Sequence, residues 1–416
     1  MTEQKKTISV NGRTYKWPQC PVVAVCVDGS QPEYIEEAIK AGVMPWTAKV
    51  VAEQGSDLRA DCVVPSFTNP NNISIVTGVP PRVHGICGNF YYDRENDKEV
   101  MMNEPSLLRT DTIFKAFQDA GAKIAIVTAK DKLRRLLGNG LTYGKEGAIC
   151  FSSEKADQVT YEEHGIEGVL DMVGMEVPSV YSGELSEFIF AAGVKLMERE
   201  RPDIMYLSTT DYIQHKFAPG SEGANKFYAM MDKYWAQLDA LGAIVALTAD
   251  HGMNAKHHND GTPDVIFLQS LLDEKFGAGN TRVILPITDP YVVHHGALGS
   301  FATIYLDEAM KGPVLDYLTT VPGLEEVLTN AQACDKFGLA PDRTGDIIVV
   351  SDQQKVLGTT EERHDLSGLE VPLRSHGGIT EQCVPLIVSQ PVGGVDPARR
   401  LRNFDIYDIA LNHTAA

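Results

Sequence analysis

The sequence predicts an α/β sandwich around a mostly parallel central sheet, with an α+β domain inserted into it. Apolar, β-branched runs predict buried parallel strands at residues 22–27, 123–128, 204–208, 243–248 and 384–389. Helical patterns separate these runs, as in a sheet whose strands are joined by helices. This alternation of apolar strands and helices is interrupted between about residues 260 and 373, and it returns with the strand at residue 384.

The predicted helices have recognisable boundaries. Segments 32–41 and 45–53 each begin with proline, which is favoured in the first helical turn. Segment 110–120 starts with Thr and Asp and stops at Gly121, a natural helix end. Longer helical patterns cover residues 182–201 and 226–241. Helices of this length can cover a parallel sheet.

The interrupted region has its own strands and helices. Strand-like runs lie at residues 281–287, 300–305 and 346–351, and helix-like segments lie at 312–318 and near 324–333. We therefore expect a catalytic domain of residues 1–259 plus 374–416. Residues 260–373 are expected to form the inserted α+β domain.

Composition and charge exclude several classes of protein. The net charge of -19 argues against nucleic-acid binding, which needs clustered Lys and Arg. The sequence shows no secretory signal and no apolar run of 18 residues, so we expect no membrane segment. Seven scattered cysteines without a C-x-x-C pair indicate a reduced, cytoplasmic chain.

Acids and histidines follow the predicted strands. Asp28 ends the first strand, Asp211 follows the third, Asp250-His251 follows the fourth, and His376 comes before the last. In α/β sheets, ligands bind at the carboxyl ends of strands. Carboxylates with imidazoles suit zinc or manganese. The alternative for any one aspartate is that it caps the next helix.

Asp211 and His215 are four residues apart. This spacing places both side chains on one face of a helix, so that they can reach one metal ion. The alternative is a hydrogen-bonded pair at the surface. The position directly after a buried strand favours the metal.

Thr68 is the candidate nucleophile. It lies in Ser-Phe-Thr-Asn-Pro-Asn, at the predicted start of a helix, where backbone N–H groups and the helix dipole favour an anion. A neighbouring metal would favour its alkoxide. Two alternatives stay open: Thr68 is only a helix cap, or Ser66 is the nucleophile.

Several of these segments together resemble the alkaline phosphatase superfamily, in its nucleotide pyrophosphatase/phosphodiesterase-like branch. The segments that carry the resemblance are Asp28, residues 66–71, Thr77-Gly78, His84-Gly85-Ile86, Asn89, Thr210-Asp211, His215, Asp250-His251-Gly252 and His376-Gly377-Gly378. Each is weak alone, but their order and spacing from residue 28 to 378 are specific.

The resemblance implies an alkaline phosphatase-like fold with an inserted cap, and two Zn²⁺ ions per chain. One ion would be held by Asp211, His215 and His376. The other would be held by Asp28, Thr68, Asp250 and His251. Asn89 would donate a hydrogen bond to a phosphoryl oxygen, and His215 would also lie at the substrate. Zinc rather than manganese rests on this resemblance.

Lys130 and Lys132 suggest the substrate. They follow the second predicted strand, on the face where the metals are expected, and could bind a small carboxylate. The alternative is a solvated surface pair. Within the branch, the motifs look like those of enzymes that hydrolyse phosphonoacetate. The expected reaction is cleavage of its C–P bond to acetate and phosphate.

The expected mechanism has two steps. Thr68 attacks phosphorus to form a phosphothreonine, and a zinc-bound hydroxide then hydrolyses it. Two alternatives are a phosphodiesterase or nucleotide pyrophosphatase with the same metals, and a non-catalytic metal-binding protein. The expected partner is a small-molecule phosphonate, without nucleic acid or membrane, and a homodimer is possible.

Overall fold

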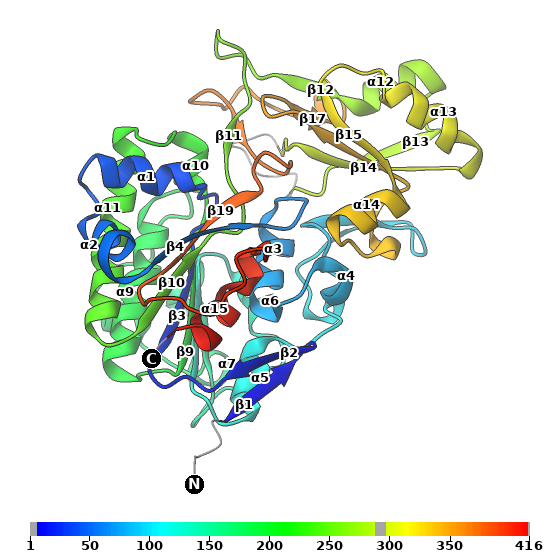
Figure 1. The fold of residues 1–416 in the computed structure, drawn as a ribbon. Coiled ribbons are helices and arrows are strands. Elements are labelled where there is room, and N and C mark those ends of the chain that lie inside the picture. Colours follow the sequence, from blue (N-terminus) through cyan, green and yellow to red (C-terminus); the bar gives the residue numbers. More distant parts are fainter. Residues whose placement is uncertain (1–5, 288–296, 415–416) are drawn as a thin grey trace.

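A seven-stranded sheet forms the centre of the larger lobe (Figure 1). The computed structural model describes residues 6–287 and 297–414. Listed across the sheet, the strands are β4 (Ser56–Asp61), β19 (Cys383–Val388), β10 (Ile244–Thr248), β3 (Val22–Cys26), β9 (Ile204–Ser208), β7 (Ile124–Thr128) and β8 (Ile149–Ser152). Strands β10, β3, β9, β7 and β8 run parallel, which confirms the predicted α/β class.

Within this sheet, the prediction was wrong about one strand and missed two. Strand β19 was predicted to be parallel but pairs antiparallel with both β10 and β4. It begins shortly after His376, at the edge where the parallel strands end, so the chain must run back across the sheet. Strand β4 was missed because its residues are mostly half-exposed, and β8 because it has four residues.

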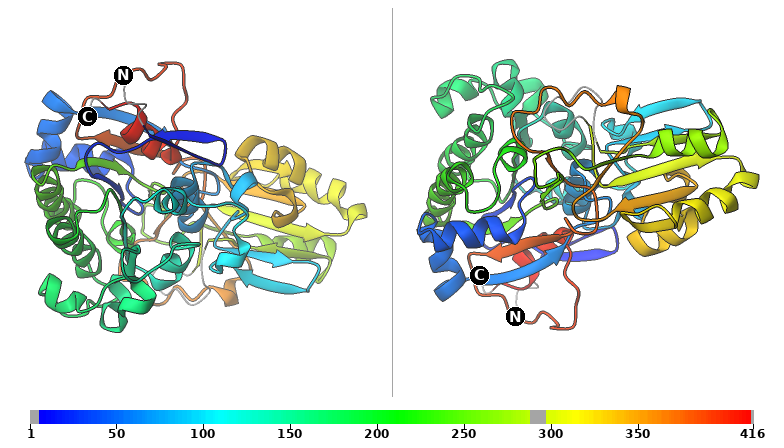
Figure 2. Two further views of the ribbon diagram at one scale, coloured as in Figure 1. Left: turned by 90° about the horizontal axis from the view of Figure 1, so that it is seen from below. Right: turned by 90° about the horizontal axis from the view of Figure 1, so that it is seen from above.

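Helices cover both faces of the sheet (Figure 2). One face carries α1 (Pro32–Lys40), α2 (Pro45–Lys49), α9 (Glu184–Arg199) and α11 (Glu222–Ala240). The other carries α3 (Thr68–Thr77), α5 (Ile113–Asp119), α6 (Asp131–Leu137) and α15 (Ile406–Asn412). Both sides of each central strand are therefore buried, which explains the continuous apolar runs.

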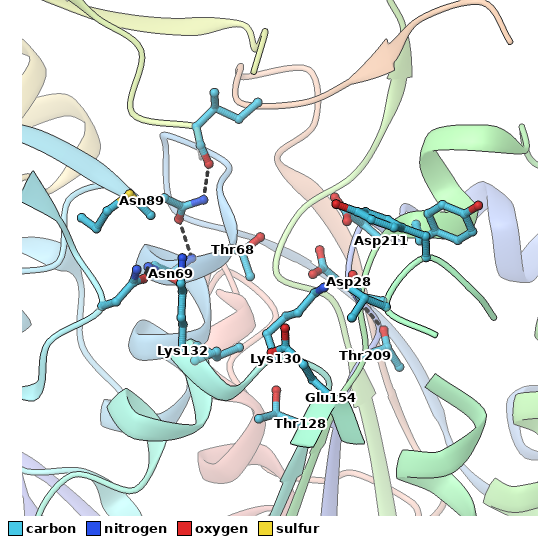
Figure 3. Close-up of a pocket in the computed structure, with 18 of the residues that line it drawn as sticks. Asp28, Thr68, Asn69, Asn89, Thr128, Lys130, Lys132, Glu154, Thr209 and Asp211 are labelled. Carbon is cyan, nitrogen blue, oxygen red and sulfur yellow. Dashed lines mark hydrogen bonds between the residues drawn. The ribbon is translucent and has the colours of Figure 1, made fainter. Parts of the chain in front are cut away.

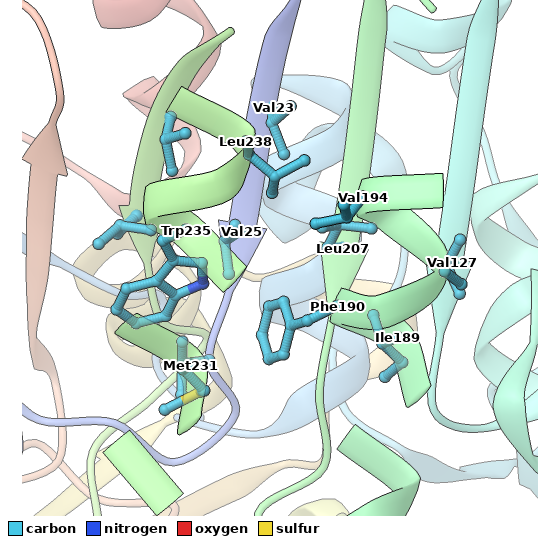
Figure 4. Close-up of a cluster of buried hydrophobic side chains, with 14 of the residues drawn as sticks. Val23, Val25, Val127, Ile189, Phe190, Val194, Leu207, Met231, Trp235 and Leu238 are labelled. Atoms are coloured by element: carbon cyan, nitrogen blue, oxygen red, sulfur yellow. The ribbon is translucent and has the colours of Figure 1, made fainter. Parts of the chain in front are cut away.

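Alternate strand residues face the two helical layers. Val23 and Val25 of β3 pack with Phe190 of α9 and Trp235 of α11 (Figure 4). Val22, Ala24 and Cys26 face the opposite layer. This period of two is the geometry of an extended strand. A sheet buried in this way holds its strand ends rigidly, which matters for the site.

The smaller lobe contains a second sheet, which is antiparallel. Its order is β13 (Thr281–Ile284), β14 (Phe301–Leu306), β16 (Ile347–Ser351) and β15 (Leu324–Thr329). One apolar cluster joins this sheet to α12 (Leu268–Phe276) and α13 (Glu308–Leu318). A second cluster joins it to α14 (Asn330–Phe337) and to Val64 and Phe67 of the larger lobe. The division of the chain at residues 259/260 and 373/374 stays a prediction.

The prediction of a helix near residues 324–333 was wrong for its first half. Residues 324–329 form strand β15, and the helix begins only at Asn330. Thr329 and Gln332 form a capping box, in which each side chain bonds the other's backbone. This cap fixes the point at which the strand becomes a helix. Among the described helices, none is both long and apolar enough to cross a bilayer.

Candidate active site

The carboxyl ends of four parallel strands align at one edge of the sheet. Cys26 pairs with Thr248 and Ser208, and Ser208 pairs with Thr128, so these four strands end in register. The residues that follow carry the predicted site: Asp28, Lys130, Asp211, Asp250 and His251. Their common depth is set by strand pairing, since they lie far apart in sequence.

Asp211, His215 and His376 meet as predicted. Asp211 precedes α10 (Tyr212–Lys216), and its Oδ2 lies 2.9 Å from Nε2 of His215. Nε2 of His376 lies 3.6 Å from the same oxygen. One carboxylate and two imidazoles, with ligand atoms within 4.8 Å of one another, could hold a metal ion.

A second group lies beside the first. Asp28, His251 and again Asp211 offer ligand atoms within 4.8 Å of one another. Nε2 of His251 lies 3.1 Å from Oδ1 of Asp28 and 3.8 Å from Oδ2 of Asp250. The structure thus places the Asp211 carboxylate near both groups, whereas the prediction assigned it to one ion. Asp250 lies at the margin of the second group.

The three histidines share one hydrogen-bonding pattern. Nδ1 of His215, His251 and His376 lies 2.7, 2.8 and 2.7 Å from a backbone carbonyl oxygen. A carbonyl only accepts, so each Nδ1 carries the proton and donates it. With Nδ1 engaged by a carbonyl, each ring turns Nε2 toward the aspartates, which is the orientation that histidine ligands of metals adopt.

This arrangement calls for a cation. Oδ1 of Asp28 and Nε2 of His251 are buried and make no hydrogen bond in the described part of the chain. Burial, with Asp250 and Asp211 nearby, raises the pKa of Asp28 well above its usual range. Burial alone would lower the pKa of His251, but Asp250 and Asp28 raise it to about 10. The site fits a metal because an ion would satisfy these groups together.

Thr68 stands at the start of α3 as the first helical residue. The helix cap is Phe67, so the reading of Thr68 as a cap is wrong. Ser66 is fully buried: its Oγ donates to the Gly378 carbonyl oxygen and accepts from the Gly377 N–H, both at 2.9 Å. Thr68 lines the cavity described next, and this geometry favours Thr68 over Ser66 as the nucleophile.

A cavity of about 360 Å³ opens beside Thr68 (Figure 3). Its lining includes six other predicted site residues, which are Asp28, Asn89, Lys130, Lys132, Asp211 and His376. His215, Asp250 and His251 are buried and do not contribute to this lining. The structure therefore brings both lysines into the same cavity as the candidate nucleophile.

Asn89 is held in place from two sides. Its Oδ1 accepts a 2.9 Å hydrogen bond from the N–H of Asn69, in the first turn of α3. Its Nδ2 donates to the carbonyl of Ile287. An Nδ2 group carries two protons, so one proton is left for a ligand in the cavity.

Lys130 is half-buried beside charged neighbours. Burial lowers its pKa, and the carboxylates of Glu154 and Asp211 act in the opposite direction. Its Nζ lies 5.8 Å from the centre of the Tyr181 ring. The lysine is thus partly desolvated, which strengthens its attraction for an anion.

Sequence reasoning missed several lining residues. Glu154, Tyr181 and Thr209 also line the cavity. The Asp28 N–H donates to Oγ1 of Thr209 at 2.9 Å, so Thr209 helps fix the loop that carries Asp28. Thr209 directly follows a buried strand, which was a usable signal. Tyr181 lies in a loop without a pattern, and nothing in the sequence marked it.

The other histidines have separate places. His84 is fully buried, and burial beside Arg343 lowers its pKa to about 3. Its Nδ1 accepts from the N–H of Ile86 and its Nε2 bonds Ser74, so it shapes the turn before Asn89. His257 bonds the His258 carbonyl. His294 and His295 lie outside the described residues.

Comparisons with known proteins add independent evidence. The family model for type I phosphodiesterase / nucleotide pyrophosphatase matches residues 22–378. Phosphonoacetate hydrolase from Sinorhizobium meliloti 1021 has been solved in complex with phosphonoacetate and with phosphonoformate. Both structures give a TM-score of 0.96 and 56% sequence identity, covering 99% of this chain and 100% of theirs.

More distant relatives match less. Ectonucleotide pyrophosphatase/phosphodiesterase family member 1 of Rattus norvegicus is 25% identical over 272 residues, 60% of this chain. That match spans only 27% of the rat protein's length. The alkaline phosphatase PafA has a TM-score of 0.66 at 16% identity, covering 94% of each chain. The fold is therefore alkaline phosphatase-like, as predicted.

Proposed function

Because the chain belongs to the type I phosphodiesterase/nucleotide pyrophosphatase family of the alkaline phosphatase superfamily, and is a hydrolase, we propose that it hydrolyses the C–P bond of phosphonoacetate with two zinc ions. The products are acetate and phosphate. One observation carries the proposal. Lys130 lies in one cavity with Thr68 and Asp211, in a chain 56% identical to an enzyme solved with phosphonoacetate.

We propose the same metal ligands that the sequence suggested. Asp211, His215 and His376 would hold one ion, and Asp28, Thr68, Asp250 and His251 the other. Two buried atoms that make no hydrogen bond within the described residues, Oδ1 of Asp28 and Nε2 of His251, support this assignment. When bound, the ions supply positive charge that polarises the phosphoryl group and lowers the pKa of a hydroxyl or water beside it.

The chain's own residues carry out the first step. Thr68 loses its proton to solvent, its Oγ1 attacks phosphorus, and the C–P bond breaks. The bonding electrons leave with the carbon and spread into the adjacent carboxylate. Asn89 donates its remaining N–H to a phosphoryl oxygen. A proton taken up by the departing carbon gives acetate, and a phosphothreonine stays on the enzyme.

The second step restores Thr68. Water attacks the phosphothreonine and releases phosphate, and Thr68 Oγ recovers its proton. The cavity's lysines do not take part in this step. They act only while the leaving group is present.

The lysines explain why a carbon can leave. A carbanion is a far poorer leaving group than an alkoxide unless its charge is stabilised as it forms. Lys130 and Lys132 would bind the carboxylate and stabilise the enolate-like charge that develops there. Because Lys130 is partly desolvated, it attracts the developing negative charge more strongly than a lysine at an exposed surface would.

The proposal includes the setting. We expect a small-molecule phosphonate as the partner, with no nucleic acid or membrane surface, in the reducing cytoplasm. All seven cysteines lie within the described residues and are free thiols, as expected for a chain kept in a reducing compartment. Whether two chains assemble as a homodimer stays a prediction.

A second candidate is phosphodiester or nucleotide pyrophosphate hydrolysis by the same groups. The family model and the match to the rat relative favour it. The two candidates share the metals and Thr68. They differ in the leaving group, and therefore in their need for Lys130.

The test compares Lys130→Met with the wild type on two substrates. The change should lower kcat/KM for phosphonoacetate by about 100-fold or more, because a charge that stabilises the transition state is lost. Hydrolysis of bis-(4-nitrophenyl) phosphate should change by only a few-fold. Lys195→Met, at a half-exposed position on α9, is the control and should change neither.

The contrary result is equally clear. A zinc-loaded wild type that cleaves the diester well but releases no phosphate from phosphonoacetate supports the second candidate. Equal losses on both substrates in Lys130→Met would show that the lysine serves the phosphoryl group and not the carboxylate.

A further inference from the structure

Asn72 lies beneath the candidate active site, one helical turn after Thr68. Its side chain is completely buried on α3. Nδ2 donates to the carbonyl of Thr68 and to Oδ2 of Asp250, both at 3.1 Å. Oδ1 accepts from the Tyr206 hydroxyl at 2.7 Å and from the Ser208 hydroxyl at 3.0 Å. All four hydrogen-bonding positions of the amide are therefore filled.

The orientation of this amide is determined by its partners. The Thr68 carbonyl and the Asp250 carboxylate only accept hydrogen bonds, so they must face Nδ2. A flipped amide would bring Oδ1 against two acceptors, and a buried contact of that kind is unfavourable. Tyr206 and Ser208, both on the central strand β9, hold the other end of the amide.

Two functional elements thus share one fixed support. The first turn of α3 carries Thr68, and the segment after β10 carries Asp250 and His251. The remaining Asp250 oxygen, Oδ1, accepts from the N–H groups of Gly29 and His251 at 3.2 and 3.0 Å. Asn72 donates to the other oxygen, Oδ2, and thereby fixes the rotation of the Asp250 carboxylate about its Cβ–Cγ bond.

We propose that Asn72 is a positioning residue that aligns the Asp250 carboxylate and the Thr68 backbone for the second metal ion. This inference rests on the proposed two-zinc function. Residues that hydrogen-bond metal ligands orient them, and their loss commonly weakens metal binding by about 10- to 100-fold. A purely structural asparagine would affect both ions equally, or neither.

The experiment measures zinc retention in Asn72→Asp. This change keeps the shape but replaces the donor with an oxygen that faces the Thr68 carbonyl and the Asp250 carboxylate. Purified proteins are dialysed against a graded series of chelator concentrations, and zinc per chain is measured by elemental analysis. We expect N72D to lose one ion at a chelator concentration at which the wild type keeps both. We also expect kcat to fall more than KM changes.

Two further variants provide a control and a second test of the same position. Ser74→Ala removes another buried hydrogen bond of α3, to His84, and should retain zinc like the wild type. Asn72→Ala removes both donations without adding a charge, and it carries the test if N72D does not fold. Circular dichroism of the metal-free proteins checks the fold.

The outcomes separate the two claims. If N72D and N72A keep both ions like the wild type, or lose both ions in parallel, the positioning role is overturned. If the wild type itself binds no zinc, the proposed function fails, whatever the variants do. Selective loss of one ion, with S74A unchanged, supports the role of Asn72.

Discussion

At the scale of single residues, the site depends on where each side chain's proton lies. Three histidines donate Nδ1 protons to backbone carbonyls and turn Nε2 toward Asp28 and Asp211. Backbone carbonyls are fixed by the fold, so the imidazole orientations are fixed before any ion binds. A chain of net charge -19 could hold an anionic substrate at this site because bound cations would reverse the local field.

Thr68 gives the first prediction. Thr68→Ala should lower phosphonoacetate turnover by about 1,000-fold or more, because the attacking oxygen is removed. The melting temperature should change little, since Thr68 is half-buried and the helix cap is Phe67. Phosphate release and thermal unfolding measure the two effects.

The control for Thr68 is Ser66→Ala. The Ser66 hydroxyl bonds the loop after His376. Removing this hydroxyl should therefore lower stability, and it should reduce turnover by a smaller factor than Thr68→Ala does. A larger loss of turnover in Ser66→Ala than in Thr68→Ala would reverse the assignment of the nucleophile.

Much of the site could be predicted residue by residue, and its limits have a physical cause. Asp28, Asp211 and Asp250 are visible in sequence because each follows an apolar run. Asn72 was missed because its role depends on a contact with Asp250, which lies 178 residues away in the sequence. A single sequence shows which residues end strands, but it does not show which side chains meet beneath them.

At the scale of elements, a buried ion pair joins three segments around the site. Lys256 and Glu381 are both completely buried, and Nζ of Lys256 lies 2.9 Å from Oε1 of Glu381. Nζ also donates to the Gln353 carbonyl of the smaller lobe, at 2.8 Å. The other carboxylate oxygen accepts from Gly378 at 2.9 Å, and the Glu381 carbonyl accepts from Gly252 at 2.7 Å. The pair therefore ties the loops after His251 and His376 to the turn that follows β16.

Breaking this pair should be costly. Lys256→Met leaves the Glu381 charge buried without its partner, and the free energy of unfolding should fall by about 3–5 kcal/mol. Lys40→Met is a matched control, because it removes an exposed lysine that pairs with Glu37 on α1 and should cost less than about 1 kcal/mol. Urea unfolding measures both. Equal, small losses in the two variants would show that the buried pair adds no specific stability.

The same pair predicts a pH dependence. Burial would raise the pKa of Glu381, but Lys256 and the surrounding donors lower it below its usual value. A lowered pKa in the folded state means that this stabilisation is present above the unfolded pKa of about 4.3. It is lost as the pH falls through the folded pKa. Glu381→Gln should therefore destabilise the protein more at pH 7 than near pH 3.5, as measured by thermal unfolding. A constant difference across this range would contradict the assignment.

At the scale of the whole molecule, the burial of a strand determined whether it could be predicted from the sequence. The strands buried on both faces were predicted almost to the residue, because they are continuous apolar runs. Strand β4 mixes exposed and buried residues, and the direction of β19 depends on where the preceding loop leaves the chain. The start of α14 depends on a capping box whose partners are three residues apart, and that signal was overlooked.

The two lobes meet beside Thr68, the candidate nucleophile. The ring of Phe67 packs edge-on against Phe301 of the second sheet, with centroids 6.3 Å apart, and against His376 at 5.6 Å. The residue before Thr68 therefore contacts both the smaller lobe and a predicted metal ligand. This contact links the position of the smaller lobe to the geometry of the site.

We propose that two zinc ions and Thr68 together cleave a carbon–phosphorus bond. The most direct test is to remove metal from the purified wild type with a chelator and to add zinc back stepwise, while phosphate and acetate released from phosphonoacetate are measured together. We expect no products without metal, equal amounts of both products with zinc, and full activity near two ions per chain. Release by the metal-free protein, or a zinc-saturated protein that leaves phosphonoacetate intact, would contradict it.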